Sequence, residues 1–117
     1  MTKNEILRMP EFPNDADGNS LRSLMEHGSD VYKEMEIDFS LLVPNENAGV
    51  QFATYVRDYG FRPSVTYDEK HNCWTCNCSK TMIPLYDSLI REQAWLAEAG
   101  AKFGAKNDGW GTFGNAP

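Results

Sequence analysis

Residues 31–42 alternate between apolar and polar side chains, and this pattern limits the possible folds more than any other feature of the sequence. The apolar residues of one parity are Val31, Met35, Ile37, Phe39 and Leu41. The residues of the other parity are Tyr32, Glu34, Glu36, Asp38 and Ser40. Because side chains on a strand point alternately to the two faces of a sheet, the pattern predicts a strand with one face in the core. Its other face would carry an acidic stripe.

Helical spacing and further alternation follow one another along the rest of the chain. Helices are predicted over residues 20–27, 44–59 and 84–99. Each is followed by a glycine that can close it in the left-handed conformation, at Gly28, Gly60 and Gly100. The apolar stripe of the last helix is predicted to be Tyr86, Leu89, Ile90, Ala94 and Ala97. Further strands are predicted over residues 61–67, 73–82 and 101–106, the first of them an edge strand because Pro63 lacks a ladder donor.

This order is a helix followed by β-α-β-β-α-β, which predicts an α+β fold. Two split β-α-β units form a ferredoxin-like sandwich, in which a four-stranded antiparallel sheet carries its helices on one face. The additional N-terminal helix would pack beside them. The length of 117 residues fits a single domain over residues 1–117. Residues 1–12 are expected to be loosely ordered, and residues 107–117 to form a C-terminal tail.

Composition narrows the class of partner. The net charge is −6, from 11 Lys and Arg against 17 Asp and Glu. Such a surface repels phosphate backbones, so a basic protein segment is a better expected partner than a nucleic acid. No apolar run is long enough to cross a membrane, and the first residues lack the layout of a signal peptide, so a cytoplasmic protein is expected.

The acidic stripe of Glu34, Glu36 and Asp38 has two interpretations. It could be a solvated sheet face on which Arg62, Lys80 or a lysine of the last strand pairs with the carboxylates. It could instead be a docking face for a segment rich in arginine or lysine, where charge favours rapid and selective association.

Other chemistries receive less support. His71, Cys73, Cys76 and Cys78 have the side chains of a zinc site, but on a strand Cys73 points away from the other two cysteines. No pair of nucleophile and base stands out, so no metal, cofactor or enzyme activity is predicted. The order of elements is also that of the RNA-recognition motif, but the expected open-face positions carry one aromatic residue, Tyr32, and three carboxylates.

The C-terminal string Asp108-Gly109-Trp110-Gly111 places a large aromatic residue between glycines. Trp110 could be a latch over the edge of the core, or an anchor that faces a partner. Asp108 is expected to accept backbone donors within a turn. Trp95, off the stripe of its helix, is expected to pack against the leading helix or to be partly exposed.

Segments spread over most of the chain from about residue 12 resemble the ribonuclease E inhibitor B family, also called regulator of ribonuclease activity B. The resemblance rests on Phe12-Pro13-Asn14-Asp15-Ala16-Asp17-Gly18, Leu21-Arg22, Gly28-Ser29-Asp30, Ile37-Asp38-Phe39, Pro44, Tyr59-Gly60-Phe61 and Asp108-Gly109-Trp110-Gly111-Thr112. Asn107 departs from the pattern, since a tyrosine is common there, and well-studied members carry a longer acidic C-terminal extension.

The resemblance implies a ferredoxin-like fold and a non-catalytic protein that binds ribonuclease E, through that enzyme's basic scaffold region, and lowers its activity. The residues expected to bind the partner are Glu34, Glu36, Asp38, Asp108 and Trp110. The alternative is a ferredoxin-like module that pairs with itself or with another protein, and a His/Cys metal site is a third, more remote possibility.

Overall fold

The computed structural model describes residues 12–117, so the expectation for the N-terminal segment falls almost wholly outside the described residues. The elements are α2 (Ala16–Glu26), β1 (Met35–Val43), α3 (Glu46–Arg57), β2 (Arg62–Asp68), β3 (Cys73–Met82), α4 (Tyr86–Ala101) and β4 (Lys106–Gly111). The predicted order of a helix followed by β-α-β-β-α-β is confirmed.

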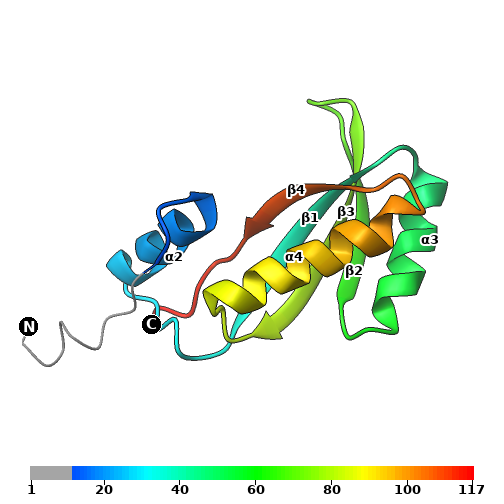
Figure 1. Ribbon diagram of the computed structural model, residues 1–117. Helices are drawn as coiled ribbons and strands as arrows, with labels where there is room; N and C mark the ends of the chain where they lie inside the picture. Colours follow the sequence, from blue (N-terminus) through cyan, green and yellow to red (C-terminus); the bar gives the residue numbers. More distant parts are fainter. Residues whose placement is uncertain (1–11) are drawn as a thin grey trace, which may run out of the picture.

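The strands form one antiparallel sheet in the order β2-β3-β1-β4. This is the ferredoxin-like arrangement, and β2 lies at an edge, as Pro63 predicts. Helices α3 and α4 cover one face of the sheet and leave the other face open (Figure 1). Helix α2 lies at one end of the molecule, near the start of α4 and the end of β4 (Figure 1).

The core lies between the sheet and helices α3 and α4. The alternation of β1 is confirmed, because Met35, Ile37, Phe39, Leu41 and Val43 are all buried. The other fully buried side chains include Phe52, Val56, Cys76, Cys78, Leu89 and Leu96. Full burial of one large apolar side chain contributes about 1.5–3 kcal/mol, so this layer supplies most of the driving force for folding.

The predicted first strand is too long at its start. Residues 31–34 form a turn and a short irregular stretch, and β1 begins at Met35. Val31 is buried nonetheless, so its alternation with the strand residues reflects burial rather than sheet pairing. Tyr32 and Glu34 therefore lie before the sheet and not on its open face.

The glycine stops are confirmed for the first two helices but not for α4. Gly28 and Gly60 have φ values of +95° and +91° after α2 and α3. Helix α4 instead continues through Gly100 to Ala101, and Gly104, with φ +73°, makes the left-handed turn. A Cβ on Gly100 would lie 2.8 Å from Cβ of Ala105, so this glycine allows close packing.

The continuation of α4 overturns the predicted last strand. Residues 101–105 complete the helix and its turn, and β4 runs from Lys106 to Gly111. The first part of the segment expected to be a C-terminal tail, residues 107–111, is therefore strand and pairs with β1.

The predicted stripe of α4 is also partly wrong. The helix buries Leu89, Leu96 and Gly100, whereas Ala94 and Ile90 are exposed. Trp95 is half-buried, which confirms the second of its two predicted placements, partial exposure. Its indole lies against the rings of Tyr55, Tyr59 and Phe61, with centroid distances of 6.2, 4.8 and 5.9 Å. Because α4 contacts the sheet, α2 and the aromatic side chains of α3, one apolar stripe cannot describe its packing.

Candidate partner-binding surface

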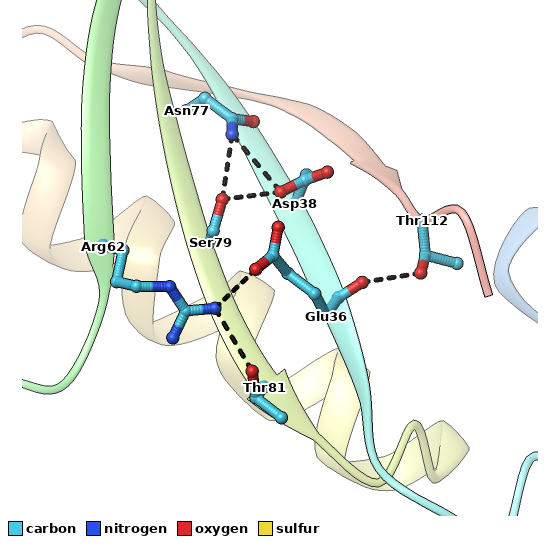
Figure 2. A network of polar contacts seen from close by, with 7 residues as sticks. All are labelled: Glu36, Asp38, Arg62, Asn77, Ser79, Thr81 and Thr112. Atoms are coloured by element: carbon cyan, nitrogen blue, oxygen red, sulfur yellow. Dashed lines mark hydrogen bonds and ion pairs between the residues drawn. The ribbon is translucent and has the colours of Figure 1, made fainter. Parts of the chain in front are cut away.

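The open face of the sheet is polar, and its side chains pair across the strands (Figure 2). Arg62 on β2 forms an ion pair of 2.8 Å with Glu36 on β1 and donates to Thr81 Oγ1 on β3 at 3.2 Å. Asp38 accepts a hydrogen bond of 2.6 Å from Ser79 Oγ and a longer one from Asn77 Nδ2. The carboxylate of Glu36 is thus bound from β2, across the intervening β3, and that of Asp38 from β3 itself.

These contacts decide part of the question about the acidic stripe. Arg62 is a cross-strand partner of Glu36, as one interpretation predicts. Lys80 is not such a partner, because it lies on the helix-covered face, where it pairs with Glu92 on α4 at 2.9 Å. The side chain of Glu36 is 57% exposed, whereas Asp38 is half-buried. The charge available to a partner is therefore concentrated near the start of β1, at Glu34 and Glu36.

The open face lacks the features of an RNA-binding sheet. The strand positions that point to it on β1 and β3 include Glu36, Asp38, Thr75, Asn77 and Ser79, none of them aromatic. An RNA-recognition sheet stacks bases on aromatic rings at such positions. This face therefore offers hydroxyl, amide and carboxylate groups rather than stacking surfaces.

The cysteines do not converge on one point. Cys76 and Cys78 are buried beneath the helices with their sulfur atoms 3.9 Å apart, and Cys73 has the opposite parity on β3. His71 lies in the β2–β3 loop, where its Nδ1 contacts the carboxylate of Asp68 at 2.6 Å. The contact with Cys76 and burial raise the pKa of Cys78, which keeps that thiol protonated. Residues 12–117 bring no three potential metal ligands of the His, Cys, Asp and Glu types together.

Trp110 is a latch between three elements. In β4 it pairs with Phe39 of β1, and its half-buried ring packs against the core. Its Nε1 donates to Asp17 Oδ1 of α2 at 2.6 Å. The same oxygen accepts from Gln93 Nε2 of α4 at 3.3 Å. The side chains of Asp17 and Trp110, distant in sequence, thus join α2, α4 and β4.

Asp15, the other carboxylate of the Asp-Ala-Asp-Gly segment, has a structural role as well. It caps α2 by accepting from the backbone N–H of Gly18 at 2.8 Å, and it accepts a hydrogen bond from the hydroxyl of Tyr86 on α4. The bond from Tyr86, followed by the one from Gly18, lowers the pKa of Asp15 below its ordinary value of 3.8. The same contact with Asp15 raises the pKa of Tyr86 to about 12.

This pair predicts a dependence of stability on pH at both ends of the scale. The lowered pKa of Asp15 adds stability above the unfolded pKa of 3.8, and this is lost as pH falls through the folded value. The raised pKa of Tyr86 adds stability below about pH 10, and this is lost as pH rises toward 12.

Tyr86→Phe tests this dependence. A plot of the free energy of unfolding against pH, measured by urea unfolding between pH 2 and 11, should fall less steeply at both its acid and its alkaline limb than for the unmodified protein. Asp15→Asn keeps a capping oxygen but loses the charge, so it should remove the acid limb and reduce the alkaline limb. Limbs as steep as in the unmodified protein would contradict this assignment.

The residues after β4 form a strap, Thr112–Asn115, that closes against the loop between α2 and β1. The side chain of Asn115 accepts from the backbone N–H of Asp30 at 2.8 Å and donates to the carbonyl oxygens of Asp30 and Glu34. Its backbone N–H donates to Ser29 Oγ at 3.3 Å. Asn115 is a residue that the sequence did not single out, although Gly28-Ser29-Asp30, the segment it binds, was noted.

The turn role expected of Asp108 belongs to its neighbour. Asn107 Oδ1 accepts from the backbone N–H of Gly109 at 3.1 Å, and Gly109 has φ +88°. Asp108 itself is exposed. The structure therefore does not bring the predicted binding residues into one cluster. Glu34 and Glu36 lie near the strap, Asp38 lies within the sheet, and the ring of Trp110 is held by Asp17.

Two comparisons with known proteins complete this description. The family model described as Regulator of ribonuclease activity B matches residues 14–112. No curated protein matches the chain. Within the described residues, no helix has the length and apolar character needed to cross a membrane. The matched range includes residues 15–18, which contain Asp17, as well as its bonded partner Trp110 and all four strands of the described sheet. The chain therefore belongs to the family of regulators of ribonuclease activity B.

Proposed function

We propose that this protein binds a basic segment of ribonuclease E and lowers that enzyme's activity, without catalysing a reaction itself. The family match carries the proposal, since it identifies a regulator of ribonuclease activity. The net charge of −6 supports a basic target. On this proposal the protein acts in the cytoplasm, where it meets the enzyme.

The surface proposed for binding is the carboxylate-bearing end of the open sheet face. Glu36, which is partly exposed, lies there, Glu34 lies just before the first residue of β1, and Asp108 is exposed on β4. Trp110 would act indirectly, by fixing β4 against α2, because its polar atom is already bound to Asp17. Asp38 would act in the same way, since it holds β1 to β3.

The test is binding of the purified protein to the host's ribonuclease E, whole and without its basic scaffold region, at low and high salt. Binding is expected to need the scaffold and to weaken at high salt, because exposed charges separated by more than about 10 Å are largely screened at 0.1 M salt. The rate of RNA cleavage by the whole enzyme should fall as the protein is added.

A charge-reversal variant locates the surface. Glu34, Glu36 and Asp108 changed together to lysine should weaken binding by about tenfold or more, a change of about 1.4 kcal/mol in binding free energy. The matched control changes the exposed Glu46, Glu69 and Glu98 to lysine, which alters the net charge equally on α3, the hairpin loop and α4. An equal loss of affinity for ribonuclease E in both variants would show that net charge alone drives binding. If the unmodified protein does not bind the enzyme, the proposed function is refuted.

A further inference from the structure

Phe113 is a fully exposed aromatic residue on the strap. Its position contrasts with that of Trp110, three residues earlier, whose ring packs against the core and is bound to Asp17. Single exposed apolar residues are common on protein surfaces, so exposure alone implies no function. The surroundings of Phe113 provide the further observations.

The backbone on both sides of Phe113 is fixed by hydrogen bonds. Thr112 Oγ1 donates to the carbonyl oxygen of Glu36 at 2.6 Å and accepts from the N–H of Gly114 at 3.0 Å (Figure 2 shows the first bond). Asn115, two residues after Phe113, is bound to Ser29, Asp30 and Glu34. A ring presented on such a strap loses little conformational freedom when it binds, which is how a preorganised residue favours association.

Carboxylates lie on the segment to which the strap is bound. Thr112 and Asn115 donate to the carbonyl oxygens of Glu36 and Glu34, respectively. Both side chains are exposed, and the carboxylate of Glu34 makes no hydrogen bond or ion pair within residues 12–117. Asp30, on the same loop, is also exposed. The ring is therefore presented next to residues 30–36, where three carboxylates stand against one lysine, Lys33.

We propose that Phe113 is the anchor of the partner interface and receives a segment of the partner that is rich in arginine or lysine. A cation of that segment would lie over the face of the ring, where the ring quadrupole attracts it. Glu34 and Glu36 would bind neighbouring cations of the same segment. This inference rests on the proposed function for the identity of the partner, and it replaces Trp110 by Phe113 as the residue that faces the partner.

The test compares Phe113→Ala with the unmodified protein against two probes. One probe is the host's ribonuclease E, and the other is a fluorescent synthetic peptide of alternating arginine and glycine. Phe113→Ala should leave the melting temperature unchanged, because the ring has no packing to lose, and should weaken binding of both probes by about tenfold. Phe113→Tyr, which keeps an aromatic face, should restore most of the binding.

Two control variants separate the anchor from nonspecific effects. Val50→Ala truncates another exposed apolar side chain, on α3 at the opposite end of the molecule (Figure 1), and should change neither affinity. Glu46→Gln, on the same helix, should have no effect, whereas Glu34→Gln should weaken binding.

The outcomes distinguish this inference from the proposed function. Loss of peptide binding in Phe113→Ala supports the anchor even if ribonuclease E does not bind, in which case only the proposed function fails. Unchanged binding of ribonuclease E and of the peptide in Phe113→Ala would overturn the anchor and leave the proposed function standing. Binding of neither probe by the unmodified protein would overturn both.

Discussion

Trp110→Ala is expected to lower the free energy of unfolding by about 3 kcal/mol. Loss of a fully buried tryptophan ring costs about 3–5 kcal/mol of unfolding free energy. Because the ring of Trp110 is only half-buried, its packing contributes less than this. The hydrogen bond from Nε1 to the carboxylate of Asp17 adds to the cost, since a bond to a charged group contributes about 1.5–3 kcal/mol. Urea unfolding at neutral pH, followed by circular dichroism, measures the change.

Trp110→Phe separates packing from hydrogen bonding. It keeps an aromatic ring against the core but cannot donate to Asp17, so the expected loss of unfolding free energy is smaller than for alanine. A melting temperature unchanged in Trp110→Ala would contradict the latch and restore Trp110 as a candidate for direct contact with the partner.

The sheet could be predicted from the sequence because its physical signal is local. In β1 and β3, every second side chain points to the core, so apolar residues recur with a period of two. The bounds of β3, Cys73–Met82, agree with the sequence prediction. Pro63 marked the edge strand correctly, because a missing N–H is tolerated only where no ladder bond is lost.

The errors arose where burial depends on neighbours distant in sequence. Helix α4 contacts α2, the sheet and Tyr55 of α3, so its buried residues do not follow one stripe, and Ile90 and Ala94 of the predicted stripe are exposed. Gly100 resembled a helix stop, yet it is needed for close contact with Ala105. Nothing in a single sequence separates a glycine that ends a helix from one that lets a helix approach another segment.

The candidate surface was harder to predict for the same reason. The acidic alternation correctly placed Glu36 and Asp38 on the open face, but the bond from Ser79 to Asp38 depends on strand register. Phe113 lies only three residues after Trp110, yet its ring is exposed whereas the ring of Trp110 packs against the core. The hydrogen bonds from Asn115 to Asp30 and Glu34 fix the strap so that Phe113 faces solvent, and these bonds join residues far apart in the sequence.

Gly18→Ala tests whether the Asp-Ala-Asp-Gly segment is structural, and we expect it to destabilise the protein by about 2–3 kcal/mol. A Cβ on Gly18 would overlap the carbonyl oxygen of Pro13 and lie 3.0 Å from its carbonyl carbon. Because both are backbone atoms, no side-chain rotation can relieve the overlap, and the first turn of α2 must move. That movement also displaces the carboxylates of Asp15 and Asp17 from Tyr86 and Trp110.

The matched control is Gly111→Ala, which changes the glycine that follows Trp110 at the end of β4. A Cβ on Gly111 meets no atom within 4 Å, and its φ lies outside the left-handed region, so this change should be nearly neutral. The two variants, compared by urea unfolding, also bear on function. If Gly18→Ala lowers stability but leaves ribonuclease E binding intact once folded, the segment serves only to hold α2. Binding lost from a Gly18→Ala protein that unfolds like the unmodified one would instead place α2 itself in the interface.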